Sequence, residues 1–156
     1  DFVFISHDHW DHTGGLKSFL KVNSNVKAYL PYLFSSFTTP KVKELVLVKE
    51  PLKISENVFS TGTLKDIEQS LAVKTARGVV VIAGCSHPGV GAILERAQQF
   101  GNTIALIGGL HGFGQFDLVK DLDVVCATHC TQHKDPIQEL YPDKYIEGGA
   151  GREIVL

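Results

Sequence analysis

The sequence predicts a layered α/β fold, and three observations support this prediction. From Val79 to the end of the chain, apolar runs typical of strands alternate with segments of helical periodicity. Polar motifs rich in glycine and histidine follow these runs, at the sheet edge where ligands usually bind in open α/β sheets. The 156 residues are 44% hydrophobic, which suffices for one domain with a sizeable core or for part of a larger one.

The first half of the chain contains short apolar strands and one helix. Apolar residues recur at helical spacing over residues 15–22, which predicts the helix. Short β-rich runs predict strands at residues 2–6, 26–30, 45–48 and 57–60. Two further β-rich runs, at 70–75 and 79–83, flank a turn that contains Gly78 and predict a hairpin.

The second half continues as an alternation of helices and strands. Helices are expected at residues 90–100, 116–122 and 136–141, and strands at 103–107, 124–127 and 153–156. Asp135 is expected to cap the last helix, with Pro136 at its first position, where the missing N–H of proline is tolerated. Successive strands of this kind are usually neighbours in one sheet, so the loops that follow them should meet at one edge.

Charge, hydropathy and cysteine content exclude several classes of protein. A formal net charge of −2 argues against a nucleic-acid partner. No apolar run approaches the roughly 20 residues that cross a bilayer, so no membrane partner is expected. Three cysteines are too few for a disulfide scaffold, which favours a reducing cytoplasm. The chain begins at Asp1, contains no methionine and opens directly on a strand, so we expect a piece or processed product of a longer chain.

The segment HDHWDH at residues 7–12 is the strongest chemical signal in the sequence. It places three imidazoles and two carboxylates directly after a predicted strand. A short loop here can aim His7 and His9 toward one side, and Asp11 and His12 toward another. Imidazole and carboxylate ligands suit zinc, iron or manganese. The segment therefore predicts a metal site rather than a polar loop that happens to be rich in histidine.

Three later histidines each stand where a predicted strand ends. His87 lies in GCSHPG, His111 in GGLHG and His129 in ATHCT. Any one of them alone would more often be a satisfied polar group. Together with residues 7–12, they predict one site at which several loops converge on a single sheet edge.

HDHWDH resembles the HxHxDH signature of the metallo-β-lactamase superfamily. The resemblance implies two divalent metal ions, with zinc expected and manganese, iron or magnesium as alternatives. The implied ligands are His7, His9 and His87 for one ion and Asp11, His12 and His129 for the other. Superfamily members commonly place an Asp after the strand between the last two histidines, where this chain has GGLH. Either His111 is a ligand or near-ligand, or the two ions share only a bridging water.

Several longer segments of the sequence resemble one branch of this superfamily. FISHDHWDHTGGL, IAGCSHPG, IGGLH, ATHCT and EGGAGREIVL resemble 7,8-dihydropterin-6-methyl-4-(β-D-ribofuranosyl)aminobenzene-5′-phosphate synthases and related metal-dependent hydrolases. The resemblance implies a four-layer αββα sandwich as a single domain over residues 1–156, with its N-terminal strands missing from this chain. An isolated piece would expose an apolar sheet face, so we expect missing residues, a second chain or self-association to cover it.

The same resemblance implies an enzyme and leaves two reactions open. One is hydrolysis of an ester or phosphoester with a metal-bound hydroxide. The other is condensation of a dihydropterin methyl diphosphate with an arylamine ribose phosphate, with release of pyrophosphate. Both imply a phosphorylated small molecule as substrate, with Asp11 and His111 as candidate catalytic residues. A third interpretation is a non-catalytic metal-binding or regulatory module with one degenerate metal site. The lack of the Asp that bridges the two ions in superfamily members favours this interpretation.

Several other residues have a structural interpretation beside a functional one. The glycines of residues 108–114 either hold phosphate through their N–H groups or only permit tight turns. Cys85 and Cys130 are expected to be small buried hydrophobic residues rather than soft ligands or redox-sensitive thiols. The three cations that could bind phosphate are more often solvated surface charges: Arg77, Lys134 and Arg152. His133 is expected to lie at the surface or to contact the metal ligands without binding metal itself.

Aromatic side chains could stack on a flat substrate ring. Trp10 is expected near the site because it lies inside the ligand loop. Core packing is expected for most of the others, which are Tyr29, Tyr32, Phe34 and Phe37.

Overall fold

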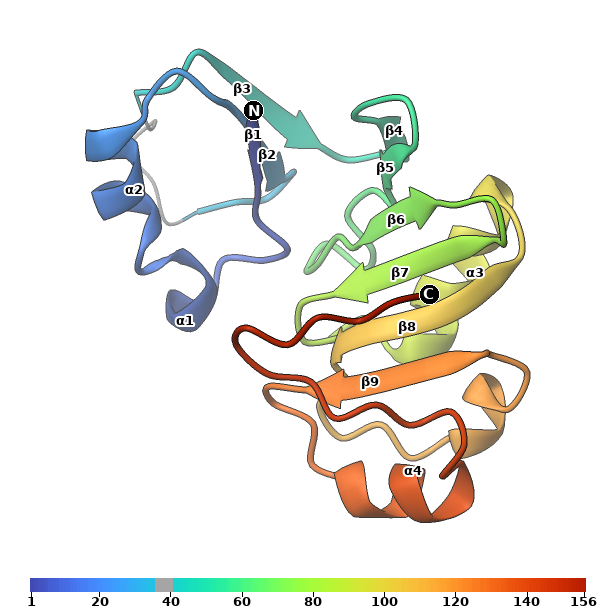
Figure 1. Cartoon of the computed structure of the whole chain (residues 1–156). Helices are drawn as coiled ribbons and strands as arrows, with labels where there is room; N and C mark the ends of the chain where they lie inside the picture. The colour runs from blue at the N-terminus through green and yellow to red at the C-terminus, as the bar shows by residue number, and fades with distance from the viewer. Residues whose placement is uncertain (36–40) are drawn as a thin grey trace.

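The computed structural model describes residues 1–35 and 41–156, and these form two β-sheets with helices on their outer faces (Figure 1). The smaller sheet has the order β1-β2-β3, with bounds Phe2–Phe4, Lys27–Pro31 and Glu44–Val48. The larger sheet has the order β4-β5-β6-β7-β8-β9, with bounds Leu52–Lys53, Val58–Ser60, Leu71–Lys74, Val79–Ala83, Thr103–Gly109 and Val124–Thr128.

The helices are short and lie mostly on the outer faces of the sheets. They are α1 (Trp10–Thr13), α2 (Leu16–Val22), α3 (Val90–Ala97) and α4 (Lys134–Leu140), with 3₁₀ turns at Gln98–Phe100 and Phe116–Val119. In Figure 1, α2 lies beyond the smaller sheet, α3 lies behind the larger one, and α4 lies below β9 at the bottom of the view. The expected mixed α/β architecture of helix, sheet, sheet and helix is therefore confirmed.

The larger sheet combines an antiparallel and a parallel half. β6 and β7 form the predicted hairpin, with Leu71 opposite Ile82. β7, β8 and β9 then run parallel to one another, so their carboxyl ends meet at one edge. This confirms the prediction that these successive strands are neighbours, and it explains why the loops that follow them lie together.

Each sheet packs against its own helices. In α3, the buried residues are Val90, Ile93, Leu94 and Ala97, a spacing that gives one apolar face. This face packs on the larger sheet through Val81 and Leu106, together with Ile137 of α4. On the smaller sheet, Ile5 and Leu30 form a separate cluster with Leu16 of α2. The two cores fix the positions of β1 and β7 independently.

Gln69 joins the two sheets. Its backbone N–H donates to Ser6 O at 2.9 Å, and its Nε2 donates to Ile5 O at 2.9 Å and Tyr29 O at 3.3 Å. Gly84, at the end of β7, lies against the same part of β1, since a Cβ on it would lie 2.7 Å from Ser6 Cβ. The end of β1 is therefore held beside the end of β7.

Several predictions about the second half of the chain are wrong. Residues 153–156 form no strand, because the edge of β9 is already occupied by a parallel bridge from Val125 to Tyr145. The helix expected at 116–122 is a single 3₁₀ turn. The last helix begins at Lys134, and His133 rather than Asp135 is its N-cap residue. Pro136 is tolerated at the third helical position because that N–H also has no intrahelical partner.

Some large apolar side chains on the strands are exposed. They are Phe2 on β1, Leu47 on β3 and Ile82 on β7. That missing residues, a second chain or self-association cover such a face stays a prediction. Within the described parts of the chain, no helix has the length and apolar character needed to span a membrane.

Candidate metal centre

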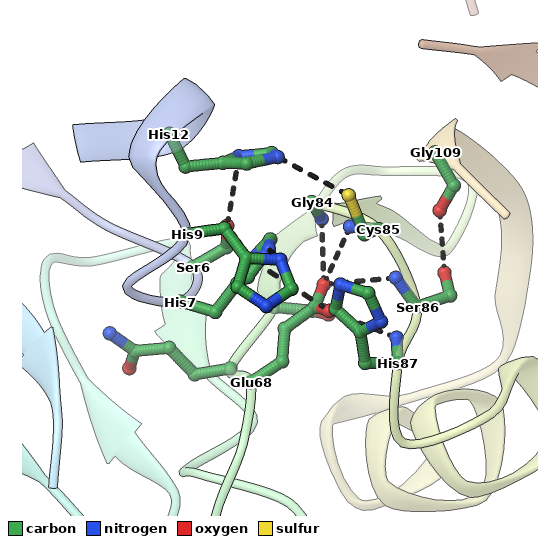
Figure 2. Close-up of polar contacts among 12 residues, drawn as sticks. Ser6, His7, His9, His12, Glu68, Gly84, Cys85, Ser86, His87 and Gly109 are labelled. Carbon is green, nitrogen blue, oxygen red and sulfur yellow. Dashed lines mark hydrogen bonds and ion pairs between the residues drawn. The ribbon is translucent and has the colours of Figure 1, made fainter. Parts of the chain in front are cut away.

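Most of the residues predicted as metal ligands lie together where the two sheets meet. Figure 2 shows four of them, His7, His9, His12 and His87. Asp11 and His129 lie next to His12. The segment that contains His7, His9 and His12 follows β1 of the smaller sheet, whereas His87 and His129 follow β7 and β9 of the larger one. The expectation that all these loops sit on one edge of a single sheet is therefore wrong. The sheets meet at Gln69, and this contact brings the loops of one sheet to the edge of the other.

His7, His9 and His87 form a first group. His7 Nε2 lies 3.1 Å from His9 Nδ1, and the ring of His87 lies 4.8 Å from that of His7 and 4.7 Å from that of His9. His7 is only 1% exposed. His87 Nε2 is buried and has no hydrogen-bond partner among the described residues. A buried polar atom without a partner costs about 1–3 kcal/mol, and a bound cation would remove that cost.

Asp11, His12 and His129 form a second group beside the first. Asp11 Oδ2 lies 3.6 Å from His12 Nε2 and 3.2 Å from His129 Nε2, and the two Nε2 atoms are 3.2 Å apart. The ring centres of His7 and His12 are 4.2 Å apart, so the two groups adjoin. The implied ligand sets are thus brought together in space, while their binding of metal stays a prediction.

Burial favours the neutral form of three imidazoles in the cluster, while hydrogen bonding and neighbouring groups keep Asp11 ionised. Desolvation lowers the pKa of His7 to about 4 and also lowers the pKa of His12 and of His87. Desolvation raises the pKa of Asp11, but its backbone hydrogen bond and the neighbouring His12 outweigh this effect and lower it overall. Neutral imidazoles and an ionised carboxylate are the forms that bind metal ions.

Glu68 is a central residue that the sequence analysis missed. Its carboxylate is completely buried. Oε1 accepts the backbone N–H groups of Gly84 at 3.0 Å, Cys85 at 2.9 Å and Ser86 at 3.1 Å, and Oε2 accepts that of His87 at 3.0 Å (Figure 2). Glu68 stands in the stretch DIEQS, which contains no metal-ligand motif. Only the position of Glu68 in the fold identifies it as part of the site.

The loops of the site contain strained backbone. Ser86, His111 and His129 have φ values of +61°, +46° and +49°, in the left-handed region that residues other than glycine seldom adopt. Ser86 Oγ donates to Gly109 O at 2.7 Å and helps to hold the first of these turns. Such strain persists where surrounding contacts enforce it, as they often do at functional sites.

His111 lies at the edge of the first group. Its side chain is exposed, and its ring centre lies 5.0 Å from that of His87. It is absent from the two compact sets of ligand atoms that the described residues form, which are His7 with Cys85 and His87, and His12 with Cys85 and His129. His9 and Asp11 are absent from these sets as well, but each has an atom within 3.2 Å of another proposed ligand, whereas His111 contacts the cluster through the 5.0 Å ring contact with His87. The geometry thus favours the near-ligand alternative for His111, and it adds the thiol of Cys85 to the candidate ligands.

Other residues singled out in the sequence lie apart from these groups. His133 Nδ1 is 2.9 Å from Phe113 O, and Arg77 pairs with Asp123 at 3.0 Å. Trp10 begins α1 and is 82% exposed. Tyr29 is buried and Phe34 packs beside the smaller core, whereas Tyr32 is exposed. Phe37 lies outside the described residues.

A pocket of about 410 Å³ lies beside the second group. His129 and Thr128 line it at the end of β9, together with the glycine-rich segment 148–150 and Arg152. Arg152 has no ion-pair partner in the described parts of the chain. The pocket therefore offers a free guanidinium close to a predicted metal ligand.

The fold and the cluster define a class of protein, and comparison with known proteins agrees. The profile of the Metallo-beta-lactamase superfamily matches residues 1–98. This chain belongs to that superfamily, whose members generally bind divalent metal ions.

Two curated relatives and one solved structure are similar to the chain. The 7,8-dihydropterin-6-methyl-4-(beta-D-ribofuranosyl)-aminobenzene-5'-phosphate synthase of Methanocaldococcus jannaschii is 24% identical, over 86% of this chain and 67% of that protein. An uncharacterized protein of the same organism is 22% identical, over 99% of this chain and 78% of its own length. The crystal structure of Tm1679, a metal-dependent hydrolase of the beta-lactamase superfamily, matches with a TM-score of 0.74 at 22% identity, over 99% of this chain and 78% of that one.

Proposed function

We propose that the chain is an enzyme that binds two divalent metal ions and cleaves an ester or phosphoester bond in a small phosphorylated molecule. The observation that carries this proposal is the convergence of five imidazoles and one carboxylate from three loops. Neutral imidazoles packed against one another stabilise a fold poorly, because each ring has only one N–H donor to offer, and among the described residues His87 Nε2 is left buried without a partner. A pair of bound cations would give those nitrogens their partners.

The residues fit this role in two groups. His7, His9 and His87 would hold one ion, and the orphaned His87 Nε2 supports that assignment. The other ion would be held by Asp11, His12 and His129. When bound, such ions polarise the bond to be broken and make water more acidic.

Arg152 and the adjoining pocket favour a phosphorylated substrate. A guanidinium presents a planar fork of N–H donors that matches two phosphate oxygens. Because His129 lines the same pocket, a phosphate bound by Arg152 would lie next to the second ligand group. A substrate of this kind would be anchored at one end and presented to the metal ligands at the other.

Two side chains are suited to moving protons. Asp11 is ionised, so its Oδ2 can bind the second ion beside His129 while its other carboxylate oxygen accepts a proton from the attacking water. His111 is exposed beside His87, so a ring N–H can donate a proton to the leaving oxygen. These roles make Asp11 and His111 the proposed catalytic residues.

One observation favours a second reaction. The relative that is 24% identical is named a synthase, and in the condensation proposed here an arylamine would replace water as the nucleophile while diphosphate leaves. The same ligand groups and the same anion pocket would serve both reactions. The two reactions differ in the nucleophile, which is water in hydrolysis and the arylamine in condensation. Whether turnover requires the arylamine therefore decides between them.

Metal analysis combined with a substrate panel tests the proposal. We expect two equivalents of zinc per chain, and cleavage of a chromogenic phosphoester that stops on chelation and returns with metal. Turnover only in the presence of an arylamine ribose phosphate would replace hydrolysis by condensation. One loosely bound ion without turnover on either substrate would refute the enzyme and leave a metal-binding module.

A further inference from the structure

The thiol of Cys85 lies between the two ligand groups. Its Sγ is 3.2 Å from His12 Nε2 in the second group. It also lies within 4.8 Å of a ring nitrogen of both His7 and His87 in the first group, and of His129 in the second. Among the described residues, Cys85 is the member that both compact sets of ligand atoms share. Figure 2 shows its sulfur directed toward the ring of His12.

The loop that carries Cys85 is held rigidly. The side chain is only 3% exposed, and the backbone N–H donates to Glu68 Oε1 at 2.9 Å. Gly109, at the end of β8, packs so closely on this loop that a Cβ there would lie 3.2 Å from Cys85 Cα and 2.8 Å from Cys130 Sγ. A side chain at position 109 would therefore collide with the loop that carries the thiol.

Burial alone does not explain this position. A cysteine that only fills space needs apolar neighbours, whereas Cys85 Sγ faces ring nitrogens from both groups. Thiolate is a strong ligand of zinc and a poor ligand of magnesium, and a single sulfur can bind two soft cations. Binding would form metal–sulfur bonds and release the thiol proton to water.

We propose that Cys85 is a metal ligand shared by the two ions. The inference rests on the proposed function, since it assumes that metal binds in the cluster. It replaces the expectation that Cys85 is a small hydrophobic residue, and it assigns to a thiol the bridging place that the sequence left to His111 or to a water. A soft shared ligand also selects zinc, cobalt or cadmium over magnesium.

Cobalt substitution tests this directly, because a cobalt–thiolate bond gives an intense near-ultraviolet charge-transfer band that imidazole and carboxylate ligands do not give. We expect metal-free wild-type protein loaded with two equivalents of Co²⁺ to show this band. The band should disappear in Cys85→Ser and persist in Cys130→Ser and Cys126→Ser, which serve as matched controls. Zinc affinity in Cys85→Ser should fall at least tenfold for both ions.

The outcomes separate this inference from the proposed function. Failure of the wild-type protein to bind cobalt would overturn both. Two bound cobalt ions without the sulfur band would overturn the inference and leave the metal enzyme in place. A band that survives in Cys85→Ser, or a fall in only one of the two zinc affinities, would also overturn the shared thiolate. Cys85→Ala gives the same spectroscopic test if Cys85→Ser does not fold.

Discussion

Glu68 Oε2 accepts the backbone N–H of His87 at 3.0 Å, so a fully buried carboxylate fixes the backbone of a predicted metal ligand. The same carboxylate lies 3.9 Å from His7 Nδ1. Glu68 thus contacts the third histidine of the first group through its backbone and faces the first histidine through its ring. It acts as a positioning residue that joins the loop after β1 to the loop after β7.

Replacing Glu68 with glutamine should destabilise the protein and weaken metal binding. Both carboxylate oxygens accept N–H groups. A glutamine amide would turn a donor toward one of these donors and leave a buried N–H group without a partner. We expect the free energy of unfolding of the metal-free protein to fall by about 2–3 kcal/mol in urea titrations, and zinc affinity to fall about 10–100-fold.

The control for this substitution is Glu56→Gln, because Glu56 is exposed in a loop away from the cluster. Equal stability losses in the two variants would contradict the role assigned to Glu68. Unchanged zinc affinity in Glu68→Gln would show that the carboxylate supports the fold without positioning ligands.

Local sequence patterns predicted most of the elements and the ligand candidates. The hairpin of β6 and β7 and the parallel strands β8 and β9 follow from apolar runs separated by turns. HDHWDH concentrates its ligand types within six residues, and a short loop keeps such neighbours together. These features are local, so one sequence suffices to show them.

The remaining features depend on contacts distant in sequence. Gln69 brings β1 against the larger sheet, and no pattern around residue 69 reveals this contact. Glu68 and Cys85 acquire their roles only when the loops after β1 and β7 meet. The error at residues 153–156 has the same origin, because the bridge at Tyr145 occupies the edge of β9 before those residues reach it.

Removing the imidazole of His9 should abolish metal binding to the first group while the fold survives. His9 is exposed, so water can reach the space left by its ring and replace it as the partner of His7 Nε2. The unfolding free energy of the metal-free His9→Ala variant should therefore fall by no more than about 1 kcal/mol. Zinc should raise the melting temperature of wild type and fail to do so fully in the variant. His133→Ala is the matched control, since His133 contacts Phe113 O instead of the cluster and should retain two equivalents of zinc. Full zinc content in His9→Ala would refute the ligand assignment.

His111→Ala should separate metal binding from catalysis. The ring of His111 lies beside His87 but outside the compact sets of ligand atoms. We therefore expect two equivalents of metal in the variant, with kcat lowered about 100-fold or more through loss of a proton donor. Loss of one equivalent, measured by elemental analysis, would instead make His111 a ligand.

Gly84→Ala should disrupt the junction of the two sheets. The added Cβ would lie 2.7 Å from Ser6 Cβ and 3.0 Å from Glu68 Oε1, and both neighbours are held by hydrogen bonds. Overpacking of this kind costs about 1–3 kcal/mol, which urea unfolding of the metal-free protein would detect. Gly114→Ala is the control, because a Cβ there meets nothing within 4 Å. A loss of similar size in both variants would mean that glycine replacement, rather than the junction, is responsible.

Arg152→Ala should weaken the binding of phosphorylated substrates more than it slows their conversion. The guanidinium lines the pocket beside His129 but belongs to neither ligand group. We expect KM for a phosphorylated substrate, and the inhibition constant of inorganic phosphate, to rise about tenfold, because a charge-assisted hydrogen bond contributes about 1.5–3 kcal/mol when fully formed and less at an exposed site. Zinc content should stay at the wild-type value.

Arg77→Ala controls for the loss of one positive charge, since Arg77 pairs with Asp123 at 3.0 Å and does not line the pocket. Equal changes in KM for both variants would reduce the effect to net charge, and unchanged phosphate inhibition in Arg152→Ala would remove the pocket from substrate binding.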